Sequence, residues 1–348
     1  MQFPAQAYQL PVRGRVIRGT GRAPPRQGTL LLPLARPCPV AVKQKIGYLC
    51  FKPMIMLTLD PKTLTPVQIQ GYLQGAIGPR PIAFASTVDA QGNPNLSPFS
   101  FFNIFSANPP ILVFSPARRV RDNTIKHTLI NCQETREVVI NVVNYAMVQQ
   151  MSLSSTEYPD GVNEFIKAGF TAVPSHVVKP YRVQESPVQL ECKVNEIIAL
   201  GTEGGAGNLI LCEVVKIHIN EAVLDAKGTI DPQAIDLVAR LGGNWYSRAN
   251  AGLFEVEKPL ATLGIGVDAI PSFVRESAVF DGNDLGKLGN VEALPTEAEI
   301  AIFVKENLPV KAALSSADEE QVHLKAKAFL DAGAVDAAWK TLLAPRVH

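Results

Sequence analysis

Small polar side chains alternate with phenylalanines along one segment of this 348-residue chain. The polar members are Ser97, Ser100, Asn103, Ser106 and Asn108, and the aromatic members are Phe99, Phe101, Phe102 and Phe105. A flat heteroaromatic ligand needs an apolar slot and a few fixed hydrogen-bonding groups that read its polar edge. An ordinary pair of core strands, with serines that satisfy backbone groups at turns, would have the same composition. The segment thus indicates either a ring-binding site or part of a β core.

A basic cluster follows this segment. Its members and their polar neighbours are Ser115, Arg118, Arg119, Arg121, Asp122, Asn123, Thr124 and Lys126. Asp and Asn are common helix N-caps, so we expect a helix from Asp122 to Thr135. Free N–H groups at a helix start, hydroxyl donors and arginines together favour a phosphate. A solvated basic loop would have the same residues, but beside the aromatic segment the cluster indicates a ligand with a ring and a phosphate.

Other catalytic patterns are missing from the sequence. It has no GxSxG, HExxH or Walker motif, and no GxGxxG that opens a helix. The histidines are isolated, and the cysteines (Cys38, Cys50, Cys132, Cys192, Cys212) show no metal-binding spacing. We therefore predict no metal site, no disulfide framework, and reduced thiols in a cytoplasmic protein, the last three in the core. His218 is the nearest candidate for a polar group at a barrel mouth, and the catalytic side chain stays unknown.

The elements that position these residues are mostly strands. Apolar, β-branched runs predict strands at 81–88, 111–114, 138–143, 188–199 and 208–219. Turn residues at 89–94 and 204–208 join neighbouring strands, which favours a barrel or a sandwich. Helices are expected at 122–135 and 162–168. Two more are expected near the C-terminus: one begins at the capping box of Thr296 and Glu299, and the other runs from Ser316 onward.

The first 59 residues differ in composition from the rest. They contain six Arg and three Lys but no acidic residue, and eight prolines interrupt them. We interpret residues 1–53 as a disordered extension, with Met54 or Met56 as the natural start. Over the whole chain 33 basic residues balance 32 acidic ones, which argues against a nucleic-acid-binding protein. No apolar run is long enough for a membrane-spanning helix, so we expect a soluble protein.

The segment RPIAFASTVDAQGNPNLSPFSFFNIFSANPPILVFSP (80–116), followed by RRVRDNT (118–124), resembles the flavin reductase-like family, in particular its flavoredoxin-type branch. The resemblance extends from about residue 60 to about residue 290. It implies a mainly β protein, an FMN-binding split barrel with inserted helices and a C-terminal helical extension. The expected domains are the extension at 1–53, the barrel at 54–290 and the C-terminal helices at 291–348.

The resemblance also implies an FMN site. The residues that match the ring and ribityl side are Asn95, Ser97, Pro98, Ser100, Phe101, Phe102 and Asn103. The residues that match the phosphate side are Ser115, Arg118, Arg121, Asp122 and Thr124. Two later stretches, 241–246 and 264–266, also look similar to the family and either border the flavin or serve as packing turns.

The implied activity is that of an NAD(P)H-dependent flavin oxidoreductase, which moves a hydride from NADH or NADPH to FMN. Such a transfer needs close stacking and orientation rather than a catalytic dyad, in agreement with the missing catalytic motifs. Family members resemble each other in being homodimers with FMN near the subunit interface, and an oxygenase or another redox protein is the expected partner. The alternative is a flavoredoxin-like electron carrier that keeps its FMN and is reduced by a partner protein.

Overall fold

The computed structural model describes residues 55–159, 161–256, 258–259, 263–315 and 318–346. The predicted extension at 1–53 lies outside these residues. Seven strands form one antiparallel sheet in the order β2-β1-β5-β8-β9-β4-β3. Their bounds are β1 Ala83–Val88, β2 Pro94–Phe99, β3 Phe102–Ala107, β4 Pro110–Phe114, β5 Glu137–Val142, β8 Val188–Ala199 and β9 Asn208–Ile219.

The sheet curls into a barrel. Its two edge strands, β2 and β3, follow each other in the chain and are joined through Ser100 and Phe101. Phe99 of β2 and Phe114 of β4 lie far apart in the strand order, yet their ring centres are 5.5 Å apart. Such a contact requires the sheet to close around a common interior. Both rings belong to one buried cluster, to which β1, β5, β8 and β9 also contribute. The predicted mainly β barrel is confirmed.

The strands follow the predicted pattern closely. All five predicted strands are present, and β8 and β9 have the expected bounds. The turn between β1 and β2 is held by Asp89, whose Oδ1 accepts hydrogen bonds from the N–H groups of Gln91 (2.9 Å) and Asn93 (2.8 Å). Cys132, Cys192 and Cys212 lie as free thiols in the barrel core, as predicted. Burial raises the pKa of the Cys132 thiol to about 12, so this thiol stays protonated.

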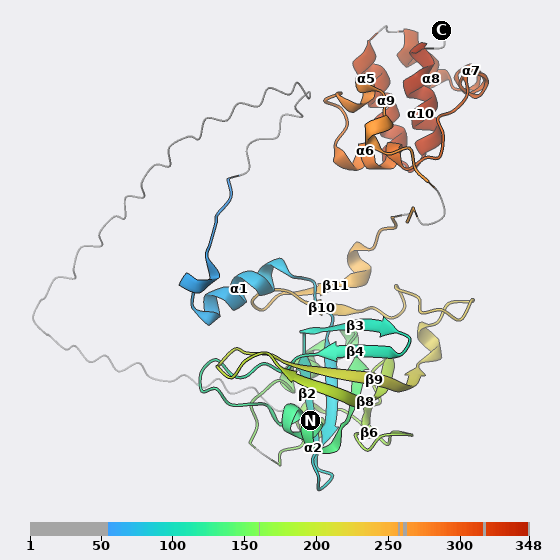
Figure 1. Ribbon diagram of the computed structural model, residues 1–348. Helices are drawn as coiled ribbons and strands as arrows, with labels where there is room; N and C mark the ends of the chain where they lie inside the picture. Colours follow the sequence, from blue (N-terminus) through green and yellow to red (C-terminus); the bar gives the residue numbers. More distant parts are fainter. Residues whose placement is uncertain (1–54, 160, 257, 260–262, 316–317, 347–348) are drawn as a thin grey trace, which may run out of the picture.

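Helices and short strands surround the barrel. They are α1 Pro66–Ala76, α2 His127–Thr135, α3 Val148–Leu153, α4 Glu164–Ala168, β6 Ala172–Val173, β7 Arg182–Val183, β10 Val238–Arg240 and β11 Tyr246–Arg248. Helix α4 begins two residues later than predicted, because the side chain of Asn163 caps the N–H of Phe165 (2.9 Å). Helix α1 has a capping box formed by Thr65 and Gln68, and it leaves most of its surface exposed. In Figure 1, α1 lies beside the β10–β11 hairpin.

The C-terminal part forms a helical unit (Figure 1). Its helices are α5 Ser272–Arg275, α6 Gly282–Gly289, α7 Glu297–Glu306, α8 Leu308–Ser315, α9 Glu319–Asp331 and α10 Val335–Leu343. The prediction of two helices after residue 296 is wrong, since the described residues of this part form four. The predicted capping box does begin α7, but α8 follows it at once. Gly333, with φ +75°, separates α9 from α10 where a single helix was expected.

This helical unit has its own core. Its buried clusters draw on residues from Ile265 onward, whereas the clusters of the barrel end at Tyr246. Helix α6 belongs to the unit, because Trp339 of α10 donates its indole N–H to the carbonyl of Leu288 (3.0 Å). We therefore propose a domain boundary before Ile265 in place of the expected one at residue 290. None of the described helices is long and apolar enough to cross a membrane.

Candidate functional site

A cavity of about 670 Å³ lies between α1 and the loop that follows β4. We call it the α1 cavity. One wall is apolar and comes from Ile69 and Leu73 of α1 and from Ile77, the residue that caps its C-terminal end. The opposite wall is basic and contains Arg118, Arg119, Arg121 and Lys126. Phe101, Arg80, Glu157 and the turn at Gly204 and Gly205 also contribute to the lining. The cavity thus combines an apolar slot with a concentration of positive charge, within the size range of small-molecule sites.

The basic loop is fixed by hydrogen bonds to its neighbours. Arg118 donates from Nε to Oδ1 of Asn123 (2.6 Å) and from its terminal nitrogen to the carbonyl of Asn123 (2.9 Å). The backbone of Arg118 also pairs with Gly205 and Ala206 in the turn between β8 and β9. Asn123 has φ 56°, a conformation that Asn tolerates better than most residues. The guanidinium of Arg118 is therefore held in place before any ligand arrives.

The helix expected at Asp122 begins instead at His127, and this part of the prediction is wrong. Lys126 occupies the N-cap position of α2 and makes no side-chain cap. The Asp122 carboxylate accepts hydrogen bonds from the hydroxyl (2.7 Å) and the N–H (3.1 Å) of Thr124, which closes a local turn. These bonds, with Arg121, lower the pKa of Asp122 to about 2. A phosphate near Thr124 would thus meet a carboxylate and no helix dipole.

Glu157 forms ion pairs with two of the arginines. Its Oε1 lies 3.1 Å from Nε of Arg119, and its Oε2 lies 3.0 Å from a terminal nitrogen of Arg121. The hydrogen bond from Arg121 is the main reason that the pKa of Glu157 is lowered. Arg119 also donates to the hydroxyl of Thr124 (2.8 Å). Glu157 was missed by the sequence analysis, because nothing local to residue 157 indicates a partner 36 or 38 residues away.

Lys126 connects the α1 cavity with a smaller one of about 30 Å³, which it also lines. Asn95 and Ser97 line the smaller cavity with Thr128. Asn95 is buried and donates from Nδ2 to the hydroxyls of Thr128 (2.9 Å) and Thr87 (3.3 Å). The amide donors of Asn95 are therefore engaged within the protein, while Ser97 faces this second, narrower space.

The aromatic segment is divided between the two sides of the barrel wall. Phe99 is buried in the core, and Phe102 packs against that core, whereas Phe101 lines the α1 cavity and is 40% exposed. The phenylalanines therefore do not form one continuous aromatic wall. Asn103 is exposed, and its Oδ1 accepts from the N–H of Ile104 (2.8 Å). Pro98 lies on β2, and Ser100 lies in the bend after it.

Ser115 lies behind the loop and does not line either cavity. Its N–H donates to the carbonyl of Phe101 (2.9 Å), and its side chain faces Gly207. A Cβ atom at position 207 would lie 2.7 Å from Oγ of Ser115. The predicted phosphate residues are thus divided: Arg118 and Arg121 line the α1 cavity, and Ser115, Asp122 and Thr124 do not.

Arg80, at the start of the segment 80–116, has a structural role that was not predicted. It is 8% exposed and donates to the carbonyls of Gln74 (2.6 Å), Ile77 and Leu241 (3.0 Å). It thereby fixes the C-terminal end of α1 to the β10–β11 hairpin. Burial is the main cause of its lowered pKa. Its Nε is buried and has no hydrogen-bond partner among the described residues, which leaves one donor at the lining of the α1 cavity.

The two later stretches with a family-like sequence do not line the α1 cavity. Gly242 packs against α1, since a Cβ atom there would lie 3.2 Å from Cα of Gly75. Gly266 donates its N–H to the carbonyl of Gly289 (3.0 Å) within the helical unit. Both stretches therefore serve as packing turns, which was one of the two expectations.

His218 belongs to a buried polar network at the other end of the barrel strands. Its Nε2 lies 2.7 Å from Oε1 of Glu191, which also accepts the N–H groups of His176, Val177 and Val178. Burial alone would raise the pKa of Glu191, but these hydrogen bonds lower it to about 2. His176, Glu191 and His218 are close enough together to hold a metal ion. Because the carboxylate oxygens of Glu191 already accept four hydrogen bonds, this cluster is better explained as a hydrogen-bond network that holds the loop at 176–178 in place.

Comparisons with known proteins extend the argument beyond this geometry. Residues 77–234 match the sequence profile of the flavin reductase like domain. An uncharacterized protein of Halalkalibacterium halodurans is 37% identical over 205 residues, which are 58% of this chain and 97% of that protein. The uncharacterized protein YwrF of Bacillus subtilis is 32% identical over 179 residues, which are 51% of this chain and 86% of that protein.

Two solved structures share the fold. Nitrilotriacetate monooxygenase component B from Bacillus cereus matches with a TM-score of 0.55 and 30% identity, over 58% of this chain and all of that one. The 2-nitrobenzoate 2-nitroreductase of Pseudomonas fluorescens matches with a TM-score of 0.54 and 26% identity, over 60% of this chain and all of that one. The resemblance read from residues 80–124 is confirmed, and the helical unit lies outside the matched domain.

Proposed function

Because this chain belongs to the flavin reductase-like family, we propose that it is an oxidoreductase that binds FMN in the α1 cavity and moves a hydride to it from NADH or NADPH. The observation that carries the proposal is the charge of the lining: five Arg and Lys side chains against one carboxylate, that of Glu157. Such a surface favours a dianionic phosphate. The apolar face of α1 and the ring of Phe101 would suit a flat ring.

The residues divide into two groups by their chemistry. Arg118, Arg121 and Lys126 would hold the phosphate, and Phe101, Ile69 and Leu73 would contact the ring. The unpartnered Nε of Arg80 supports the fit, because a buried donor without an acceptor is costly unless a ligand supplies one. When bound, FMN supplies the redox chemistry, as cofactors generally do. The protein supplies binding, orientation and exclusion of water, and this division of labour needs no catalytic dyad.

An absorption spectrum of the purified protein between 300 and 550 nm tests the proposal directly. Flavin bands are expected with the isolated protein or after addition of FMN, and they should bleach on anaerobic addition of NADH or NADPH. Bands that persist with both donors would favour the alternative, a flavoredoxin-like electron carrier reduced by a partner protein. A protein that takes up no FMN would contradict both the proposed oxidoreductase and the alternative electron carrier.

A variant pair tests where the phosphate binds. We expect Arg118→Ala combined with Arg121→Ala to weaken FMN binding at least about tenfold, because charge-assisted hydrogen bonds are lost. Arg248→Ala is the matched control, since Arg248 forms a similar ion pair with Asp236 (2.7 Å) but does not line the cavity. Equal FMN affinity of the double variant and the control would contradict the phosphate assignment.

We propose that the protein acts as a homodimer. Ile104 and Phe105 on the edge strand β3 are 63% and 67% exposed. Large apolar side chains gathered near a sheet edge are typical of a protein interface. Phe105→Glu should shift the mass measured by light scattering from dimer to monomer. A monomeric wild-type protein would refute the proposed assembly.

We further propose a cytoplasmic protein that passes reduced flavin to an oxygenase or another redox protein. The free thiols of the barrel core support the compartment. The similarity to a structure described as a monooxygenase component supports the class of partner. Oxidation of the NADH-reduced protein by a purified oxygenase, faster than by dissolved oxygen alone, would be the expected result.

A further inference from the structure

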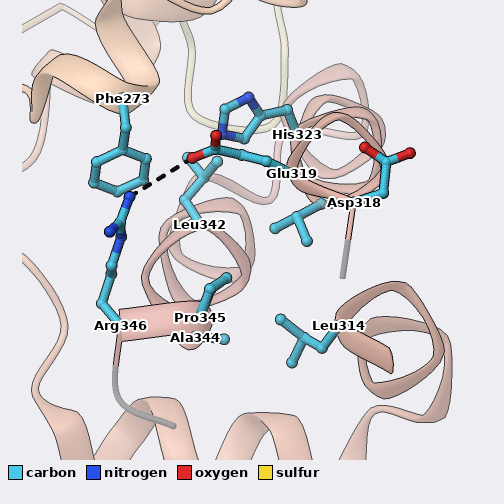
Figure 2. Close-up of a pocket in the computed structure, with 10 residues that line it drawn as sticks. Phe273, Leu314, Asp318, Glu319, His323, Leu342, Ala344, Pro345 and Arg346 are labelled. Carbon is cyan, nitrogen blue, oxygen red and sulfur yellow. Dashed lines mark ion pairs between the residues drawn. The ribbon is translucent and has the colours of Figure 1, made fainter. Parts of the chain in front are cut away.

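A second cavity, of about 380 Å³, lies in the helical unit and takes no part in the proposed FMN site. Its apolar wall includes Leu314 of α8, Val322 of α9 and Leu342 of α10. Leu314 and Leu342 are labelled in Figure 2. The volume is near the lower end of the range for ligand pockets, so it suits a small molecule rather than a folded partner. The cavity lies outside residues 77–234, which match the flavin reductase like domain.

A cation already occupies one side of this cavity. The guanidinium carbon of Arg346 lies 4.4 Å from the ring centre of Phe273, and a terminal nitrogen lies 3.6 Å from Oε1 of Glu319. Figure 2 shows these groups facing one another at the lining. An aromatic face and a carboxylate are the two partners that a guanidinium prefers. They come from different helices, α5 and α9, and converge on one position.

The charge of the lining also favours a cation. Asp318 and Glu319 contribute two carboxylates against the single guanidinium of Arg346. His323 lines the same cavity, and burial lowers the pKa of its imidazole, so that it is neutral at pH 7. Its Nδ1 lies 2.8 Å from the hydroxyl of Ser277. The imidazole of His323 therefore adds no positive charge to that of Arg346.

Arg346 itself is only loosely held. Its side chain is 59% exposed, and that of Glu319 is 63% exposed. An ion pair of this kind contributes little to stability, because solvent screens it. Arg346 can therefore leave the ring of Phe273 at small cost, and its guanidinium shows which chemical group the position accepts.

We propose that this cavity binds a small guanidinium compound whose hydrocarbon part lies along Leu314, Val322 and Leu342, and that Arg346 occupies the cation position when the compound is absent. The hydrocarbon chain would gain from the apolar wall as the stems of Arg and Lys side chains do. A ligand that competes with an internal occupant binds only to the protein molecules in which the position is free. Its apparent affinity is therefore reduced in proportion to the fraction of such molecules. Removal of the internal guanidinium should therefore strengthen binding.

Calorimetric titration of the full chain with butylguanidinium tests this inference. We expect weak binding to the wild-type protein and binding about three- to fivefold tighter to Arg346→Ala, because the weak internal contact already leaves the position free in part of the molecules. Arg346→Gln, which keeps most of the side chain, should behave in the same way. Lys325→Ala is the matched control, because Lys325 lies over the ring of Phe329 (4.8 Å) in the same unit but does not line the cavity.

A second comparison tests the carboxylate. In the Arg346→Ala protein, Glu319→Gln should weaken binding about tenfold, whereas Glu320→Gln, one residue further along α9, should not. Butylurea has the same shape without the charge and should bind neither protein. The inference is overturned if Arg346→Ala and Arg346→Gln bind butylguanidinium no tighter than wild type, or if butylurea binds as well as butylguanidinium.

Discussion

The ammonium group of Lys126 lies 5.1 Å from the centre of the Phe99 ring, between the two cavities that meet at the basic loop. Burial is the main cause of the lowered pKa of Lys126, the nearby charge of Arg119 adds to it, and the carboxylate of Glu157 partly opposes both. No hydrogen bond joins this ammonium to any other group in the described part of the chain. A partly buried cation without a hydrogen-bonded partner reduces stability, which is typical of a residue that binds an anionic ligand.

Lys126→Met should therefore have two opposite effects. The variant protein without flavin should unfold at a higher temperature than wild type, because a partly buried charge without a hydrogen-bonded partner is removed while the packing on Phe99 stays. Its affinity for FMN should fall on the order of tenfold, because a charged phosphate partner is lost. Calorimetry of the flavin-free protein and a fluorescence titration with FMN would measure the two effects. Lys216→Met, on the exposed part of β9, should change neither.

Glu157→Gln should have the opposite effect on the affinity for FMN. The carboxylate that now pairs with Arg119 and Arg121 would be gone, and both guanidiniums could then turn to a phosphate. We expect tighter FMN binding with a steeper loss of affinity as salt is added, since more unpaired positive charge takes part. Titrations at 50 and 300 mM salt would show this. Glu134→Gln, at an exposed position of α2, provides the control, and weaker FMN binding by Glu157→Gln would contradict the charge argument.

Gly207→Ala should destabilise the barrel, because the added methyl group would lie 2.7 Å from the buried hydroxyl of Ser115. Overpacking of this kind costs about 1–3 kcal/mol. Gly71→Ala, within α1, meets no atom within 4 Å and should instead stabilise its helix by about 0.5–1 kcal/mol. Urea unfolding of both variants gives the comparison. Equal effects of the two substitutions would show that the close approach of Gly207 to Ser115 is not a constraint.

The helical unit should lose stability in mild acid through His323. Its imidazole is buried against Phe280 (5.4 Å between ring centres), and this burial lowers its pKa from the usual 6.5. Below pH 6.5 the unfolded chain binds the proton more readily than the folded one, so stability declines as the pH falls toward the folded pKa. Above pH 6.5 this contribution is fully present.

His323→Gln should remove part of that pH dependence. Urea midpoints at pH 7.5 and 5.5, followed by the near-ultraviolet signal of the buried Trp339, would measure it. His176→Gln, at an exposed position near the barrel, should leave the pH dependence of this signal unchanged. A variant at position 323 that keeps the full loss of stability between the two pH values would rule out His323 as its source.

Local sequence determined the strands and turns of the barrel. The β-branched runs of β8 and β9, with the glycines between them, predicted both strands with their observed bounds, because alternation and turn chemistry act over a few residues. The same local rule failed at Asp122. An Asp that precedes a polar residue can cap a helix or close a turn with its own side chain. Here the hydrogen bonds from Thr124 to the Asp122 carboxylate favour the turn.

The sequence alone also predicted that the basic loop is a candidate binding site, since Arg118, Arg121 and Lys126 are neighbours in the chain. Only the tertiary structure decided what faces them. Glu157 reaches Arg121 across 36 residues, and the hydrogen bond from Arg80 to Leu241, which anchors α1 over the cavity, spans 161 residues. Such pairs form because the closed barrel brings distant segments together, and no local propensity encodes which segments will meet.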